Sequence, residues 1–93
     1  MPVRLDLHNP VFQEQLLALT KAERSAVLRC CTRLAAMEWS DILKDKDLGW
    51  EAIQSRMAGG ERLYSIFVTG SVRAVVKRSG EFLEFLMVLR GAA

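Results

Sequence analysis

Cationic side chains interrupt the most β-like part of this chain, residues 62–91, which read RLYSIFVTGSVRAVVKRSGEFLEFLMVLRG. Arg73 and Lys77 are set among valines, and Arg90 follows the last apolar run. Guanidinium and ammonium groups on a rigid sheet can bind phosphates, and they can stabilise negative charge that develops on a phosphate during a reaction. These residue types favour phosphate chemistry. The alternative is a strand face covered by a partner or by the preceding segment, with both cations paired to Glu84.

Other kinds of site find little support in the sequence. His8 is the single histidine, and it has no cysteine or carboxylate at a spacing typical of metal ligands, so a structural or solvated role is favoured. Cys30 and Cys31 are adjacent, and on a helix they point about 100° apart, which disfavours a disulfide between them. We therefore expect no metal site and no cofactor.

The length and the apolar pattern restrict the class of protein. A chain of 93 residues predicts one domain, residues 1–93, with no room for a second core. Its apolar runs are far shorter than the roughly 20 residues that cross a bilayer. The first ten residues, MPVRLDLHNP, lack the apolar stretch of a signal peptide. We expect a cytoplasmic protein with no membrane partner.

The charges are unevenly divided along the chain. Residues 1–55 carry 7 Lys and Arg against 8 Asp and Glu, a net charge of −1. Residues 56–93 carry 6 against 3, a net charge of +3. The β-rich part is thus the basic part, which suits contact with phosphates but also suits an ordinary solvated surface.

The elements that must position these cations can be read in chain order. Residues 3–7 alternate as a short strand, Asn9-Pro10 signals a helix start, and Thr20 with Glu23 forms a capping box for a second helix. Residues 39–53 form a connector with a short helix around 50–53, and three strands follow as an antiparallel meander. The order predicts an α+β fold: two helices on one face of an antiparallel sheet of about four strands.

Two-residue turns at Gly70-Ser71 and Ser79-Gly80 then fix the expected register. Arg73 should lie opposite Val68 on one side and Leu86 on the other. The predicted inner face carries Phe67, Val72, Ala74, Val76, Leu83, Phe85, Met87 and Leu89. The predicted outer face carries Tyr64, Ile66, Val68, Arg73, Val75, Lys77, Phe82, Glu84, Leu86, Val88 and Arg90. With the helices, the predicted core is Leu5, Phe12, Leu16, Val27, Leu34, Phe67, Val72, Ala74, Val76, Leu83, Phe85 and Met87.

The element order, LYSIFVTGSVRAVV and the connector LKDKDLGWEAI resemble the RelE/ParE superfamily of bacterial toxins. The resemblance covers nearly the whole chain and is most specific over residues 62–90. It implies a ribosome-dependent mRNA endonuclease that uses the 2′-hydroxyl of the RNA as nucleophile, or in the ParE branch a gyrase poison. It also implies neutralisation by an antitoxin protein encoded by an adjacent gene.

The resemblance assigns roles to named residues. Arg73 matches the mid-strand arginine of the family and Arg90 its second basic residue, so both are the predicted catalytic residues. The candidates for RNA binding are Lys77, Tyr64, Arg62 and Arg78. The family usually continues into a segment with a His or Tyr that acts in proton transfer or stacks on a base, whereas this chain stops at VLRGAA.

Weakened cleavage is one expectation from this difference, and a catalytically inert RelE-like module that binds a protein is the other. The apolar strand that ends at Leu89 is predicted to lie at a sheet edge. There it would pair with a second copy of the chain or with an antitoxin strand.

Overall fold

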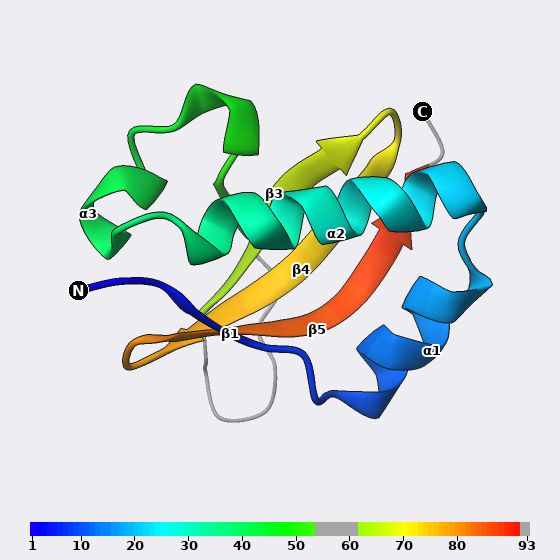
Figure 1. Cartoon of the computed structure of the whole chain (residues 1–93), viewed down its shortest axis with the longest axis horizontal. Helices are drawn as coiled ribbons and strands as arrows, with labels where there is room; N and C mark the ends of the chain where they lie inside the picture. Colours follow the sequence, from blue (N-terminus) through cyan, green and yellow to red (C-terminus); the bar gives the residue numbers. More distant parts are fainter. Residues whose placement is uncertain (54–61, 92–93) are drawn as a thin grey trace.

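The computed structural model describes residues 1–53 and 62–91 (Figure 1). The elements follow in the order β1 (Arg4–Asp6), α1 (Pro10–Ala18), α2 (Lys21–Ala35), α3 (Trp39–Ile42), the 3-10 helix η1 (Lys46–Leu48), β2 (Glu51–Ile53), β3 (Leu63–Thr69), β4 (Val72–Ser79) and β5 (Phe82–Arg90). None of the described helices is long and apolar enough to cross a membrane.

The two main helices begin where the sequence predicts. The Asn9 side chain accepts hydrogen bonds from the amides of Val11 and Phe12, at 2.8 and 3.4 Å. At α2, the Glu23 amide donates to Thr20 Oγ1 at 3.2 Å and the Thr20 amide donates to Glu23 Oε1 at 2.9 Å. This is a complete capping box, which satisfies backbone donors that the first turn leaves unpaired.

The strands within residues 1–53 and 62–91 form one five-stranded sheet in the order β1-β5-β4-β3-β2. Strands β2 to β5 are antiparallel neighbours, and β1 joins β5 in parallel, so the sheet is mixed. The short helix expected around residues 50–53 is wrong: this segment is strand β2, which pairs with β3. The tertiary pairing overrides the local pattern, since a three-residue strand carries almost no periodic signal of its own.

Both main helices contribute to a core on one face of the sheet, and Figure 1 shows α2 running across that face. Among the described residues, the largest fully buried side chains are Phe12, Phe85, Leu34, Ile42, Leu48, Ile66, Leu83, Val27, Val72 and Val76. The Phe12 and Phe85 rings meet at 5.3 Å with a 59° tilt. Most of the predicted core is confirmed, Leu5 and Leu16 being partly buried against it, whereas Phe67 and Met87 lie outside it.

A β-bulge explains the misplaced phenylalanine. The turn at Gly70-Ser71 is as predicted, since Thr69 pairs with Val72. Val68 is then an extra residue in β3, so Arg73 lies opposite Phe67 and not opposite Val68. A bulge reverses the faces of the residues beyond it. Ile66 is therefore fully buried, and Phe67 is 40% exposed.

Two departures change the register between β4 and β5. The turn is Gly80-Glu81, because Ser79 pairs with Phe82. This displacement by one residue preserves the inner and outer faces. Leu86 then forms a second bulge, since Val76 pairs with Phe85 and Val75 with Met87.

The second bulge reverses the end of β5. Val88 is buried on the helix side, opposite Ala74, and Leu89 lies opposite Arg73. Arg90 pairs with Val72, so it lies on the helix side and not on the Arg73 face as predicted. β5 is also an inner strand over its first residues, since β1 and β2 form the sheet edges. The later residues of β5 do not pair with β1, and there the Val88 amide donates to Gln15 Oε1 of α1 at 2.7 Å.

Candidate functional site

Arg73 lies on the sheet face opposite the helices, where the connector holds its guanidinium. Its Nη2 donates to the Gly49 carbonyl at 2.7 Å, and its Nε donates to Ser65 Oγ at 3.2 Å. Glu51 Oε2 lies 4.0 Å from Nη2, and 32% of the Arg73 side chain is exposed. Arg73 is thus neither free on an open face nor paired with Glu84. Its guanidinium is fixed in orientation, and about a third of the whole side chain is open to solvent.

Gly49 makes this arrangement possible. It ends η1 in the left-handed conformation, with φ of 56°, which glycine adopts without steric cost. A Cβ at this position would lie 3.3 Å from the Cβ of Phe67 and 3.6 Å from Arg73 Nη2. The backbone therefore approaches β3 and β4 closely enough for its carbonyl to accept from Arg73. In the sequence, the glycine of DLGW marks the end of a helical turn. Nothing in this motif indicates that the Gly49 carbonyl accepts a hydrogen bond from Arg73.

Lys77 lies on the same face as Arg73, as predicted, because four residues along one regular strand restore the same side. It pairs with Glu84, with Lys77 Nζ 3.4 Å from Glu84 Oε2. Both side chains are more than two-thirds buried. Glu84 Oε2 is buried and accepts no hydrogen bond from the described residues. Among these residues, the Lys77 ammonium at 3.4 Å is the group that balances its negative charge.

Arg90 lies on the helix side of the sheet, where it binds Glu23. Its Nη2 donates to both carboxylate oxygens of Glu23, at 3.0 and 3.1 Å. The backbone hydrogen bond from Thr20 and the Arg90 guanidinium both lower the pKa of Glu23. The two predicted catalytic arginines therefore lie on opposite faces, and the Arg90 contact joins the end of β5 to the start of α2.

Two other predicted RNA-binding residues lie on the helix side. Tyr64 pairs with Val76 and stacks on Trp50, with ring centroids 4.7 Å apart. The Arg78 guanidinium lies 3.9 Å from the centroid of the Trp39 ring, and its Nε donates to the Gly80 carbonyl at 2.9 Å. Both side chains thus make internal contacts with aromatic residues of the connector.

The remaining predicted RNA-binding residue, Arg62, is exposed and directly precedes β3. The structure therefore brings Arg73 and Lys77 onto one face and places Tyr64, Arg78 and Arg90 on the other.

His8 and Cys31 lie in contrasting environments. His8 is 94% exposed in the loop after β1, and its Nδ1 lies 3.0 Å from Asp6 Oδ1. The His8 amide also donates to Asp6 and lowers the pKa of its carboxyl. Burial raises the pKa of the Cys31 thiol to about 12, so this thiol is neutral at physiological pH. Within residues 1–53 and 62–91, no group of three or more His, Cys, Asp or Glu is arranged to hold a metal.

The N-terminal strand, two main helices and antiparallel strands in a mixed five-stranded sheet are a fold shared with two solved structures. The chain is similar to a chain of the archaeal RelE–RelB complex from Pyrococcus horikoshii, with a TM-score of 0.66, 21% identity and 100% of both chains covered.

It is also similar to a copper-bound mutant toxin from Helicobacter pylori, with a TM-score of 0.56, 13% identity, and 97% and 96% of the two chains covered. At these identities the likeness establishes the fold. No family model and no curated protein matches the chain.

Proposed function

We propose that this chain is a RelE-like toxin that acts on mRNA at the ribosome through the sheet face opposite its helices. The observation that carries the proposal is the placement of Arg73 and Lys77 together on that face of a RelE/ParE fold. Arg73 has about a third of its side chain exposed and can contact a phosphate, and Lys77, which is paired with Glu84, adds positive charge on the same face.

Arg73 has the geometry of a preorganised phosphate ligand. The Gly49 carbonyl and Ser65 fix its guanidinium before any ligand binds, and about a third of the side chain remains accessible. In the proposed reaction the 2′-hydroxyl of the RNA loses its proton to water, and its oxygen attacks the adjacent phosphorus. The bond to the 5′-oxygen breaks, and this oxygen takes a proton from water. Arg73 would stabilise the additional negative charge on the pentacovalent phosphate.

We propose that cleavage is slow, for two reasons found in the contacts of the site. Arg90 cannot contact the phosphate that Arg73 contacts, because it lies on the opposite face and binds Glu23. Tyr64 is also on the opposite face, stacked on Trp50, so it cannot transfer protons beside Arg73. The proposed site therefore binds and polarises the phosphate with little acid–base assistance.

A protein partner belongs to the same proposal. The similar archaeal chain was crystallised in a complex named RelE–RelB. We propose that an antitoxin encoded by an adjacent gene binds and neutralises this chain too. Co-expression with the neighbouring reading frame should then suppress growth arrest caused by this chain alone.

The test combines expression in cells with RNA binding in solution. Wild-type expression should arrest growth and produce mRNA fragments with 2′,3′-cyclic phosphate ends, and Arg73→Gln should reduce both effects. Anisotropy of a labelled single-stranded RNA should show weaker binding by Arg73→Gln. The plot of the logarithm of the binding constant against the logarithm of the salt concentration should also become shallower, its slope changing by about 0.7. Arg4→Gln, an exposed arginine at the far end of the sheet, is the matched control.

Two results would contradict the proposal. Normal growth with abundant folded protein would remove the toxin role. Unchanged RNA affinity and salt slope in Arg73→Gln would remove the assigned face. Arrest with intact mRNA and induced DNA-damage signalling would instead favour a gyrase poison.

A second candidate is a catalytically inert module that binds a protein. It is favoured by the contacts of Arg73 with the Gly49 carbonyl and of Arg90 with Glu23, which hold both guanidinium groups within the molecule. It predicts a folded, non-toxic chain whose protein complex survives Arg73→Gln.

A further inference from the structure

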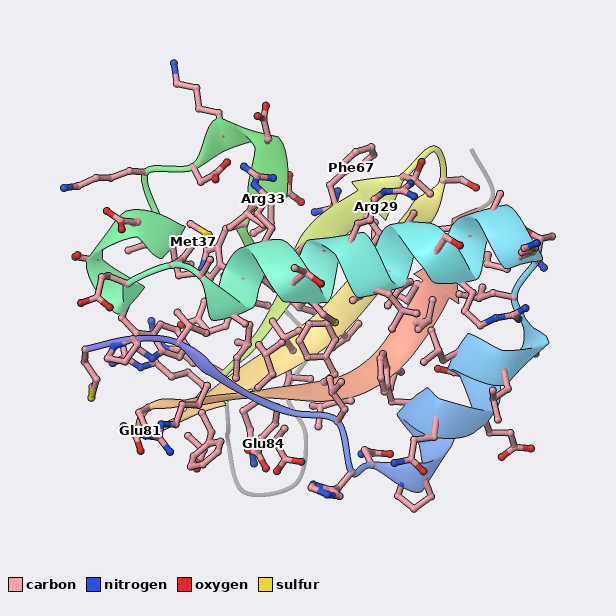
Figure 2. All side chains as sticks on the ribbon, viewed as in Figure 1. Arg29, Arg33, Met37, Phe67, Glu81 and Glu84 are labelled. Atoms are coloured by element: carbon pink, nitrogen blue, oxygen red, sulfur yellow. The ribbon has the colours of Figure 1, made fainter. Side chains whose placement is uncertain are left out.

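A pocket of about 240 Å³ opens between α2 and the end of β3, at the edge of the sheet that β2 leaves uncovered. Its lining includes Arg29, Cys30 and Arg33 from α2, and Phe67 and Val68 from β3. Figure 2 shows Arg29, Arg33 and Phe67 gathered at this side of the molecule. The pocket thus combines cationic side chains with an exposed aromatic ring.

The β3 bulge connects this pocket to the Arg73 face. Val68 is the extra residue of the bulge, and Phe67 lies directly opposite Arg73 in the ladder. The position of a Gly49 Cβ, within 3.3 Å of Phe67 Cβ and 3.6 Å of Arg73 Nη2, shows that both residues adjoin the same stretch of backbone. A strand of nucleic acid with a phosphate at Arg73 would therefore have its neighbouring base within reach of Phe67.

The two arginines of the pocket are in different states. Arg33 forms an ion pair with Asp45 and lies 3.8 Å from Asp47 Oδ2, so its charge is balanced inside the molecule. Arg29 is exposed and has no ion pair or hydrogen bond among the residues that the structure describes. Arg29 is therefore the cation of this pocket that is available to a ligand.

We propose that this pocket binds one nucleotide of the RNA strand, with its base against the Phe67 ring and its phosphate at Arg29. The inference rests on the proposed RNA-binding function and extends the site from β4 to α2. Single-strand binding surfaces combine an aromatic platform with nearby cations, since every base has a π-face. An acidic protein segment could use Arg29, but the location of Phe67 opposite Arg73 favours nucleic acid.

The test compares two phenylalanines in the same protein. Phe67 and Phe82 are both 40% exposed, and Phe82 lies opposite Arg4 at the other end of the sheet. Phe67→Leu should weaken binding of a short labelled single-stranded RNA about tenfold, whereas Phe82→Leu should leave it unchanged. An RNA of the same length with abasic sites should bind both variants equally. Circular dichroism melting confirms that each variant is folded.

Arg29 is tested by charge. Arg29→Gln should weaken RNA binding and make its salt dependence shallower, with Arg4→Gln as the control. Equal effects of Phe67→Leu and Phe82→Leu, or the same loss on abasic RNA, would overturn the inference.

The two failures are distinguishable. If Arg73→Gln weakens binding and Phe67→Leu does not, the pocket inference alone fails. If the wild-type protein does not bind RNA, both it and the proposed function fail. Loss of antitoxin binding in Phe67→Leu, with unchanged RNA affinity, would assign the pocket to a protein interface and overturn the inference.

Discussion

Arg73 stabilises the fold as well as presenting a cation. An arginine on an open face could be removed at little cost in stability, because exposed ion pairs contribute only about 0–1 kcal/mol. The hydrogen bonds to Gly49 and Ser65 change that expectation, since they join the connector to the sheet. Under the proposed function, the same residue is therefore under two constraints, one from folding and one from ligand binding.

Arg73→Ala should lower the free energy of unfolding by about 1–2 kcal/mol, toward the low end for charge-assisted hydrogen bonds because the side chain is 32% exposed. Urea unfolding followed by circular dichroism measures the change. Arg4→Ala, at 62% side-chain exposure, should cost less than about 0.5 kcal/mol. Equal stabilities for Arg73→Ala and the wild type would show that the connector contact contributes nothing.

Gly49 and Gly70 allow backbone strain to be separated from packing. Both have positive φ, 56° and 50°, but a Cβ would meet Phe67 and Arg73 at Gly49 and nothing within 4 Å at Gly70. Gly70→Ala should cost about 1–2 kcal/mol from its conformation alone. Gly49→Ala should cost more and should also weaken RNA binding. A smaller loss at Gly49 than at Gly70 in the same unfolding assay would contradict the close approach.

Among the elements, the helix starts were predictable because their signals are local. Asn9-Pro10 and Thr20 with Glu23 each make their capping bonds within three residues. The partner that the Glu23 carboxylate finds in Arg90, 67 residues away, has no such signal.

Glu23, at the start of α2, should make the free energy of unfolding depend on pH. The Thr20 amide, and then Arg90, hold the pKa of Glu23 below its ordinary value of about 4.3. The stabilisation is thus complete above that value and is lost as the pH falls through the lower folded pKa. The stability difference between the wild type and Glu23→Gln should be largest at neutral pH and should shrink below about pH 4. Denaturant titrations across this range measure it.

Glu14→Gln removes a carboxylate from the exposed part of α1, where the structure describes no partner for it, and serves as the control. Its stability difference should not change over the same range. If Glu23→Gln behaved like Glu14→Gln, the capping box and the Arg90 contact would be energetically unimportant.

Side-chain faces were predictable along β4, which is regular, but not along β3 and β5, which contain bulges. Arg73 and Lys77 share a face because alternation along β4 is regular, and this part of the site follows from sequence alone. Arg90 and Tyr64 were misplaced because bulges at Val68 and Leu86 reverse the relation between strands. The residues around each bulge are apolar on both faces, so hydrophobic patterning does not specify the register there.

On the scale of the whole molecule, the core lies between one sheet face and the helices, and this sidedness is testable with two phenylalanines. Phe85 is fully buried against Phe12, whereas Phe67 is 40% exposed. Phe85→Ala should cost about 3–5 kcal/mol, a large part of a typical total of about 5–15 kcal/mol.

Phe67→Ala should cost less than about 1 kcal/mol in the same urea titration, because its ring is already partly in water. Similar losses for the two variants would mean that the bulge in β3 is misplaced. The comparison therefore checks the corrected register independently of any function.

A gene that lost the codon for Leu86 would encode a chain with the same strand pairing. Val76 already lies opposite Phe85 and Val75 opposite Met87, so removing the residue between them leaves a regular ladder. Within a regular strand, loss of one codon would reverse every side chain beyond it. In β5, Val88 would stay buried and Arg90 would still reach Glu23, so related genes that differ by one codon here can encode the same architecture.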